Sequence, residues 1–336
     1  MKAALLKQAG IENLEVVDMD EPTPGPGQVK VRLRASTLNY RDLVTVQGGY
    51  GSKQKQSGLI PLSDGAGEVV EVGPGVTAYQ AGDRVTPIFF TNWFAGEPTA
   101  QAQSLALGGS AQGCAAEYGV FPVHGVVPTP DHLTDAEAAS TVCAGLTAWQ
   151  AVVEKGGIRP GDWVLTQGTG GVSIFALQFA KAMGARVIAT TSSDVKAARL
   201  KELGADHVVN YLDITEWGKA AKSLTGGNGV DLVVEVGGAG TLTQSLKSLR
   251  IGGTVAMIGI LAGQASEVNM GYVLMTNSRI QGITVGSREM HLAMYRAMEA
   301  HKIRPVISDS FPLADIRDAL AHQKAGKHFG KIALEI

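Results

Sequence analysis

A glycine-rich stretch in the middle of the chain could bind a cofactor that contains phosphate. Gly168, Gly170 and Gly171 follow an expected strand over residues 162–167 and open an apolar helical pattern. Glycines there allow a tight turn and a close approach of the backbone to a pyrophosphate, and the helix N-terminus supplies N–H groups and a positive dipole end. We therefore predict a dinucleotide loop at Gly168, Thr169, Gly170, Gly171 and Val172. A plain glycine turn is the alternative, since the last motif position is Ser173.

The residues after the next expected strand bear on which dinucleotide would bind. NAD enzymes place an Asp or Glu about 20 residues beyond the loop, to hold the ribose 2′-hydroxyl. Ser192 and Ser193 stand there instead, Lys196 follows, and Tyr211 ends the strand after that. Hydroxyls and one cation favour the 2′-phosphate of NADPH. Two observations leave room for another interpretation: Lys196 could be a solvated helix lysine, and Asp194 is an opposing charge that would also suit a helix N-cap.

Composition excludes several classes of protein. The 336 residues carry 29 Lys and Arg against 31 Asp and Glu, so the chain lacks the basic excess of a nucleic-acid binder. Hydrophobic residues make up 45% and charged residues 18%, which supports a large core and argues against disorder. The apolar runs are too short to span a bilayer. Only two cysteines are present, which fits a reducing, cytoplasmic setting.

The hydrophobic pattern predicts three zones, and the length suggests two domains. Residues 1–122 are strand-like and rich in turns. In residues 123–264, a capping-box helix from Thr134 leads into short apolar strands that alternate with helices, which indicates a parallel sheet covered on both faces. The zone 265–336 holds an expected strand over 280–285, a helix over 289–301 and an end strand over 331–336, which we expect to return to the first domain.

The glycine motif, the strand-rich N-terminal zone and the closing Gly330-Lys331 together resemble the medium-chain dehydrogenase/reductase superfamily. The resemblance covers essentially the whole chain and is strongest to the zinc-independent, quinone-oxidoreductase-like branch. It implies an α/β fold in which a doubly wound Rossmann domain (123–264) is inserted into a GroES-like, mainly-β catalytic domain (1–122 and 265–336). It also implies that substrate binds in the cleft between the two domains.

The zinc enzymes of that superfamily hold their catalytic metal with a Cys, a His and a second Cys or Asp. The resemblance places Asn39, Ser63 and Cys143 at these positions. An amide and a hydroxyl are poor substitutes for zinc ligands, and two cysteines cannot form a four-cysteine structural site. We therefore expect no metal, and we expect Cys143 to be a small buried residue rather than a ligand or nucleophile.

Without a metal, another group must polarise the substrate oxygen or deliver a proton. The resemblance implies that Asn39 lies near the nicotinamide. Tyr50, eleven positions later in a Gln-Gly-Gly-Tyr-Gly context, is similar to the tyrosine donor of enoyl-thioester reductases. A phenol with a pKa of about 10 stays protonated at neutral pH and can donate to a developing enolate. Tyr50 could instead be a packing residue at a loop tip.

Further cofactor contacts follow from strand ends and from the resemblance. Ligands bind outside the carboxyl ends of parallel strands, so residues that end two such strands should flank the nicotinamide. Trp93 and Phe94 could form an aromatic substrate wall or belong to the core, and Arg41 with Asp42 could order the site or lie in an ordinary surface contact. The expected additional cofactor contacts are Thr147, Val236, Gly237, Ile260, Leu261, His328 and Phe329.

The leading functional interpretation is an NADPH-dependent reductase that transfers hydride, without metal, to a quinone, an enone or another α,β-unsaturated carbonyl compound. The first alternative is an alcohol dehydrogenase or ketone reductase of the same superfamily. The second is a cofactor-binding protein without turnover. The apolar run over 254–262, together with the resemblance, suggests a homodimer that pairs strand to strand. We expect no nucleic-acid or membrane partner.

Overall fold

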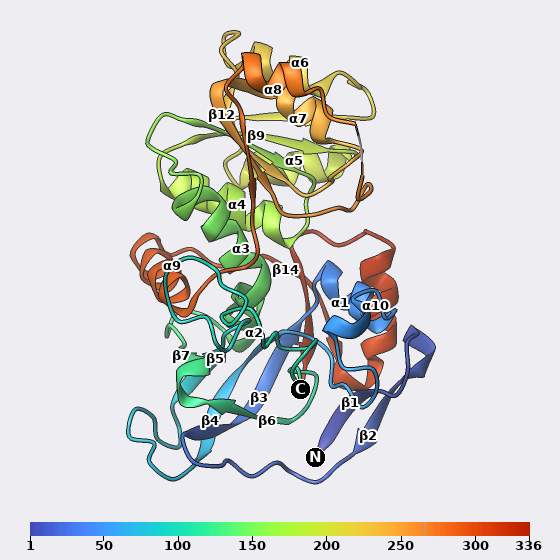
Figure 1. The fold of residues 1–336 in the computed structure, drawn as a ribbon, viewed down its shortest axis with the longest axis vertical. Coiled ribbons are helices and arrows are strands. Elements are labelled where there is room, and N and C mark those ends of the chain that lie inside the picture. The colour runs from blue at the N-terminus through green and yellow to red at the C-terminus, as the bar shows by residue number, and fades with distance from the viewer. Residues whose placement is uncertain (266) are drawn as a thin grey trace. The chain divides into compact units, whose positions relative to one another are not determined.

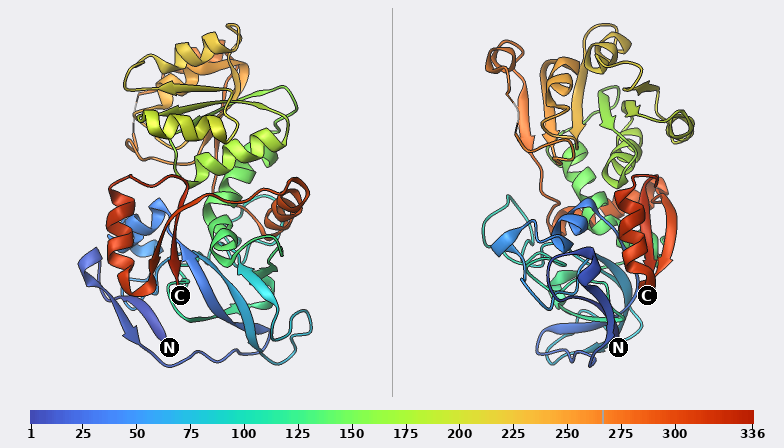
Figure 2. Two further views of the ribbon diagram at one scale, coloured as in Figure 1. Left: turned by 180° about the vertical axis from the view of Figure 1, so that it is seen from behind. Right: turned by 90° about the vertical axis from the view of Figure 1, so that its right-hand side faces the viewer.

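The computed structural model describes residues 1–265 and 267–336. The chain divides into two compact units: residues 1–146 together with 286–336, and residues 147–285. Both chain ends belong to the first unit (Figures 1 and 2). Among the described residues, no helix combines the length and the apolar character needed to cross a membrane.

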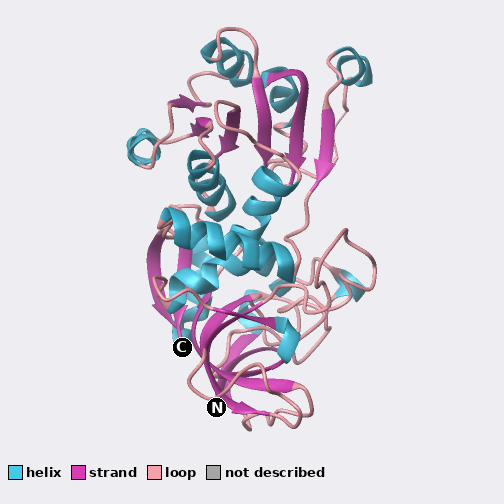
Figure 3. Cartoon of the chain, turned by 90° about the vertical axis from the view of Figure 1, so that its left-hand side faces the viewer, coloured by secondary structure: helices cyan, strands magenta, loops and turns pink. Residues whose placement is uncertain are grey.

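The second unit is built on a parallel sheet with the doubly wound strand order. Its six strands run in the order β10-β9-β8-β11-β12-β13, and every neighbouring pair is parallel. Counted from β8, this is the 3-2-1-4-5-6 order of dinucleotide-binding sheets, with the switch point between β8 and β11. Helices flank the sheet on both sides (Figure 3). The strands are β8 (Trp163–Gln167), β9 (Arg186–Thr191), β10 (His207–Asn210), β11 (Val230–Glu235), β12 (Leu249–Met257) and β13 (Arg279–Gly282); the helices are α4 (Gly171–Ala182), α5 (Asp194–Glu202), α6 (Trp217–Leu224), α7 (Leu242–Ser248) and α8 (Met270–Met275).

The first unit is a mixed, mostly antiparallel sheet with helices beside it. Its path runs β14-β15-β3-β4-β5-β7, β6 adds to β3, and β1 and β2 form a separate hairpin. The strands are β1 (Lys2–Leu6), β2 (Leu14–Asp18), β3 (Gln28–Thr37), β4 (Asp64–Val72), β5 (Arg84–Pro87), β6 (Tyr118–Pro122), β7 (Val126–Pro128), β14 (Ile307–Pro312) and β15 (Lys331–Glu335); the helices are α1 (Tyr40–Val46), α2 (Asp135–Ser140), α9 (Arg288–His301) and α10 (Ile316–Lys324).

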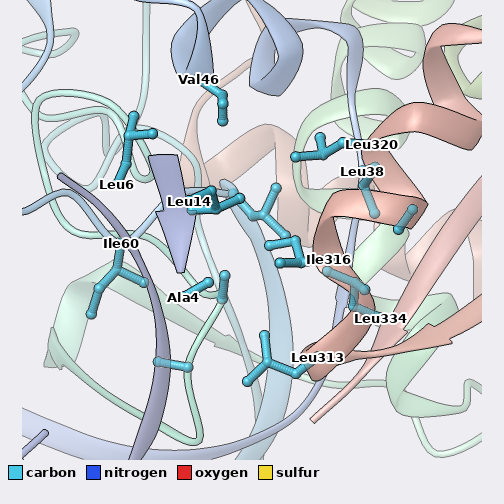
Figure 4. Close-up of a cluster of buried hydrophobic side chains, with 14 of the residues drawn as sticks. Ala4, Leu6, Leu14, Leu38, Val46, Ile60, Leu313, Ile316, Leu320 and Leu334 are labelled. Atoms are coloured by element: carbon cyan, nitrogen blue, oxygen red, sulfur yellow. The ribbon is translucent and has the colours of Figure 1, made fainter. Parts of the chain in front are cut away.

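The last strand returns to the first unit, as the sequence predicts. β15 pairs antiparallel with β3, with Ala333 opposite Thr37, and β4 pairs with the other side of β3, with Asp64 opposite Thr37. The starts of β4 and β15 therefore flank the end of β3. A cluster of buried aliphatic side chains packs beside this arrangement, and it includes Ile316 and Leu320 of α10 together with Leu38 (Figure 4).

The capping box at Thr134 is confirmed, since its hydroxyl accepts from the Glu137 N–H. The helix that it opens continues to residue 154 through π-helical turns at Thr141–Gly145 and Gln150–Glu154, with α3 (Leu146–Trp149) between them.

Two features differ from the sequence expectation. The strand expected over 280–285 is β13, which pairs with β12 and so belongs to the parallel sheet. The two units consequently divide at 146/147 and 285/286, whereas the expected domains divide at 122/123 and 264/265. Because β12 has a neighbour on each side, the apolar run over 254–262 is not at an edge of this sheet, whose edge strands are β10 and β13.

Candidate functional site

The glycine loop has the geometry of a phosphate cradle. Gly168 adopts a φ of 69°, a left-handed conformation that favours glycine. Gly170 is different: it caps α4 with an ordinary φ of −76°, and a Cβ there would meet no atom within 4 Å. Folding alone therefore does not require glycine at position 170. The open space in front of the α4 N-terminus fits a pyrophosphate held by backbone N–H groups.

The end of β9 presents hydroxyls and one lysine, as the sequence predicts. The Ser193 hydroxyl caps α5 by accepting from the Lys196 N–H at 3.4 Å, so Ser193, not Asp194, is the N-cap. The Asp194 carboxylate accepts from the Asn210 amide at 3.2 Å, which directs part of its charge toward a neighbouring side chain. Partial burial lowers the pKa of Lys196. Ser192 and Tyr211 are both exposed beside this helix start.

Sequence reasoning missed a buried carboxylate beneath the neighbouring strand ends. Glu235, the last residue of β11, is fully buried. Its carboxylate accepts from the Gln167 amide at 2.8 Å and from the Gly237 and Gly238 N–H groups at 2.8 and 2.9 Å. It also accepts from the hydroxyls of one threonine, at the N-cap of α7, and one serine within that helix. Gln167 ends β8, so this network ties together the two strands at the switch point. The sequence signal that could have revealed this carboxylate is an acidic residue at the end of an otherwise apolar strand.

The network orders the loops after β11 and β12, which together contain four of the predicted cofactor contacts. The side-chain Oε1 atom of Gln167 accepts from the Val236 N–H at 3.2 Å, and the Leu261 and Ala262 N–H groups donate to the Val236 and Gly237 backbone carbonyls. Ile260 and Leu261 are nevertheless 48% and 50% exposed, which leaves apolar surface at the carboxyl ends of β11 and β12. Thr147, a further predicted contact in this unit, is buried.

In the first unit, a second buried network surrounds Asn39. β3 ends at Thr37, and Asn39 caps α1 two residues later. The Lys331 ammonium donates to the Asn39 Oδ1 atom at 2.6 Å, to the Leu38 carbonyl at 2.7 Å and to the Asp64 carboxylate at 3.0 Å. Asp64 also accepts from the Thr37 hydroxyl at 2.6 Å. Asp64 and Lys331 were not among the predicted site residues, although Gly330-Lys331 contributed to the family resemblance.

Arg41 and Asp42 order this site rather than lying on a free surface. The fully buried Asp42 carboxylate accepts from the Asn39 N–H at 2.7 Å and pairs with Arg41 at 3.3 Å. Burial raises the pKa of Asp42 to about 6, against the opposing effect of Arg41. The Arg41 guanidinium lies 4.8 Å from the Phe89 ring centre and 5.8 Å from that of Tyr50.

Tyr50 lies beside this cluster and keeps its proton. It is 40% exposed, so its ring is accessible from solvent. Partial burial raises the pKa of Tyr50, and the Arg41 charge only partly opposes that effect. The phenol therefore stays a hydrogen-bond donor at neutral pH.

Cys143 has the character expected of an inert residue. Burial raises its pKa to about 12, so the thiolate is a negligible species at neutral pH. Reactive cysteines combine access to solvent with a lowered pKa, and Cys143, which is half-buried, lacks the lowered pKa.

The remaining predicted residues fall into different environments. Phe329 is a core side chain at 2% exposure, and its N–H donates to the Ser308 hydroxyl. His328 before it is half-buried. Trp93 is fully buried and belongs to the core, whereas Phe94 is 49% exposed and packs edge-on against His124.

Comparison with known proteins gives matches along the whole chain. Residues 25–131 match the family described as alcohol dehydrogenase GroES-like domain, and residues 171–300 match the family described as zinc-binding dehydrogenase. A zinc-type alcohol dehydrogenase-like protein from Schizosaccharomyces pombe is 41% identical over 335 residues, which span 98% of this chain and 96% of the relative.

Solved structures agree with this assignment. A crystal structure from Sinorhizobium meliloti, described as a candidate alcohol dehydrogenase, superposes with a TM-score of 0.94 at 37% identity, covering 100% of this chain and 98% of the other. An NAD-dependent alcohol dehydrogenase gives a TM-score of 0.92 at 36% identity, with 100% of both chains covered.

Two further matches differ in chemistry or cofactor. An acryloyl-coenzyme A reductase from Metallosphaera sedula is 30% identical over 342 residues, which span 99% of each chain. A mycobacterial protein complexed with NADPH gives a TM-score of 0.85 at 29% identity, with 100% of both chains covered.

The glycine loop gives a first prediction. Gly170→Ala should leave the melting temperature within about 2 °C, because the new methyl group meets open space. It should weaken dinucleotide binding by about tenfold or more, about 1.4 kcal/mol, because the methyl group would occupy the pyrophosphate space. Fluorescence titration with NADPH and a thermal melt measure the two quantities. Unchanged affinity would show that the loop is only a turn.

Proposed function

The chain belongs to the medium-chain dehydrogenase/reductase superfamily, among its zinc-type alcohol dehydrogenase-like oxidoreductases, and from that premise we propose that it is an NADPH-dependent carbonyl reductase that works without a catalytic metal. The observation that carries this proposal is the buried Lys331–Asn39–Asp64 cluster, in which Asn39, at the first of the zinc enzymes' ligand positions, accepts from an ammonium that also pairs with a carboxylate. The names of the relatives favour the alcohol dehydrogenase or ketone reductase interpretation over the quinone reductase one.

The residues present do not fit a catalytic zinc. The site needs three N, S or O ligands in deprotonated form. Cys143 has a pKa raised to about 12, and the Asn39 oxygen already accepts from the Lys331 ammonium. Among the described residues, no three His, Cys, Asp or Glu side chains gather closely enough to hold a metal ion. A zinc ion here would also face the positive charge of Lys331.

The dinucleotide does fit the second unit, and NADPH is favoured over NADH. Bound NADPH supplies hydride. The glycine loop at residues 168–172 would hold its pyrophosphate, and Ser192, Ser193, Lys196 and Tyr211 would surround the 2′-phosphate. Support comes from the capped α5 start and from the engagement of Asp194 by Asn210. The matched structures include one NAD-dependent enzyme and one NADPH complex, so the chain's own residues carry this choice.

In the proposed chemistry, two side chains donate hydrogen bonds to the substrate oxygen. Hydride adds to an electrophilic carbon, and negative charge develops on the carbonyl oxygen. The Asn39 amide and the Tyr50 phenol can donate hydrogen bonds to that oxygen, and such donors contribute most where charge develops. Tyr50 can then transfer its proton, which completes the reduction to an alcohol. Thr147, Val236, Gly237, Ile260, Leu261 and His328 are the proposed contacts to the remainder of the cofactor, whereas the predicted contact Phe329 is a core side chain.

Reduction of an enone is the second candidate. In that reaction hydride adds to the β-carbon, the same two donors stabilise the enolate oxygen, and a proton adds to the α-carbon. The spacing of Asn39 and Tyr50 supports it, as does the similarity to an acryloyl-coenzyme A reductase. A quinone substrate would use the same donors.

We also propose a cytoplasmic homodimer that pairs through β13. All four residues of this edge strand are exposed, and an uncovered edge presents free N–H and C=O groups. Met270, Leu274 and Met275 of the preceding helix α8 are 70–77% exposed, which adds apolar surface. The expected insertion of a cofactor domain into the catalytic domain is part of the same proposal.

The cofactor preference can be tested at Lys196. Lys196→Ala should weaken NADPH binding by about tenfold to a hundredfold, because one charge-assisted hydrogen bond contributes about 1.5–3 kcal/mol. NADH binding should change by less than about twofold. Lys201→Ala, on the same helix, is the matched control. Equal losses for both cofactors would show that Lys196 does not bind the 2′-phosphate.

The chemical role of Tyr50 can be tested together with the substrate class. Tyr50→Phe should lower kcat by about a hundredfold, the usual effect of losing an oxyanion donor, with NADPH affinity unchanged. The measurement is NADPH oxidation with a simple ketone, an enone and a quinone, followed by product analysis. Tyr118→Phe serves as the control. A fall in kcat of less than about threefold would make Tyr50 a packing residue.

The same panel tests the proposal as a whole. The wild-type protein should reduce at least one carbonyl compound after exhaustive chelation, and elemental analysis should find no stoichiometric zinc. Activity that disappears with chelator and returns with zinc would overturn the metal-free mechanism. Product identity separates ketone reduction from enone reduction.

A further inference from the structure

The Lys331 ammonium has no proton left for a substrate. Its side chain is 3% exposed, and an ammonium carries three N–H donors. They go to the Leu38 carbonyl, the Asn39 Oδ1 atom and the Asp64 carboxylate, at 2.7, 2.6 and 3.0 Å. Any effect of Lys331 on a substrate must therefore pass through one of these partners.

Asn39 is the partner that can transmit such an effect. An ammonium cannot accept a hydrogen bond, so the Asn39 atom that faces it must be the oxygen. The amide is thereby locked in one of its two orientations, with Nδ2 directed away from Lys331. That Nδ2 atom is buried and has no hydrogen-bond partner among the residues described.

An unsatisfied buried N–H costs about 1–3 kcal/mol, so a stable fold keeps one where a ligand is to supply the acceptor. The cation at Oδ1 also draws electron density from the amide, which makes the remaining N–H groups stronger donors. Both effects prepare Nδ2 for an oxygen on which negative charge develops.

We propose that Lys331 is a positioning residue that locks and polarises the Asn39 amide, so that the Asn39 Nδ2–H donates to the substrate carbonyl oxygen. Lys331 thus supplies the fixed positive charge of the site without contacting the substrate. The inference rests on the proposed function in taking the substrate to carry a carbonyl oxygen.

The test needs a parent variant in which Lys331 can be replaced without leaving a buried carboxylate unpaired. Lys331→Met alone would leave Asp64 unpaired, and loss of one partner of a buried ion pair can prevent folding. Asp64→Asn removes that charge but keeps a side-chain oxygen that can accept from the Lys331 ammonium, and it is the reference background. Lys331→Met is then added to it, and Lys324→Met, an exposed lysine on α10, is added as the matched control.

In the reference background, Lys331→Met should lower kcat by about tenfold or more, with KM and NADPH affinity within about threefold. The control should change kcat by less than about twofold. Asn39→Ala should lower kcat by about a hundredfold. When Asn39→Ala is already present, adding Lys331→Met should change kcat by less than about twofold, because the two residues act as one unit. If the combined variant instead loses kcat by the product of the two single losses, the two residues act independently and the proposal is overturned.

A spectroscopic readout separates this inference from the proposed function. The side-chain NH₂ of Asn39 is assigned in a protein labelled with ¹⁵N-asparagine by its loss in Asn39→Ala. Lys331→Met in the reference background should shift this pair of signals, whereas Lys324→Met should not. An unshifted pair would refute the positioning role whatever the activity. A shifted pair in a protein that reduces no carbonyl compound would retain the contact and reject the proposed function.

Discussion

The buried ion pair of Lys331 and Asp64 holds together the part of the first unit on which the proposed chemistry depends. A charge in the interior is tolerated only when its partner and its hydrogen bonds are all present. Here three strands must meet to satisfy them: β15 supplies Lys331, β4 supplies Asp64, and the end of β3 supplies the Thr37 hydroxyl and the Leu38 carbonyl. Misplacing any strand leaves a buried charge unpaired, so the pair fixes where Asn39 leaves the sheet.

In the second unit, the buried carboxylate of Glu235 likewise fixes the chain where it leaves the sheet. Glu235 ends β11 and collects donors from Gln167 and from the backbone that follows it. Residues 236–238 belong to no strand or helix, so their backbone N–H groups depend on these hydrogen bonds for their acceptors. In both units a buried carboxylate at a strand end converts an irregular segment into a fixed one. Such segments are where ligands bind in doubly wound sheets.

Local patterns predict much of this fold because they depend on neighbours in sequence. The apolar run over 162–167 and the glycine loop predicted β8 and the start of α4, and the Thr134 capping box predicted the start of α2 in the first unit, whereas α6, α7 and α8 had no predicted counterparts. The buried clusters of the candidate site were not predicted, because the residues that form them lie far apart in the sequence. Lys331 and Asp64 are 267 positions apart, and a lone lysine or aspartate carries no periodic signal of burial. Helix α1 was missed because Asn39 caps it within a zone whose other residues are typical of strands.

The cluster around Asn39 also bears on which direction of reaction the site can assist. Oxidation of an alcohol requires removal of the hydroxyl proton, which a zinc enzyme promotes through the charge of the metal. An amide donor stabilises an oxyanion but removes no proton. Asp42 is the carboxylate with a pKa raised to about 6, yet it is fully buried and already accepts from the Asn39 N–H and pairs with Arg41. Tyr50 keeps its proton at neutral pH and so serves as a donor. Under the proposed function, these donors suit carbonyl reduction at neutral pH, whereas in the reverse direction Tyr50 would first have to lose its proton to act as the base.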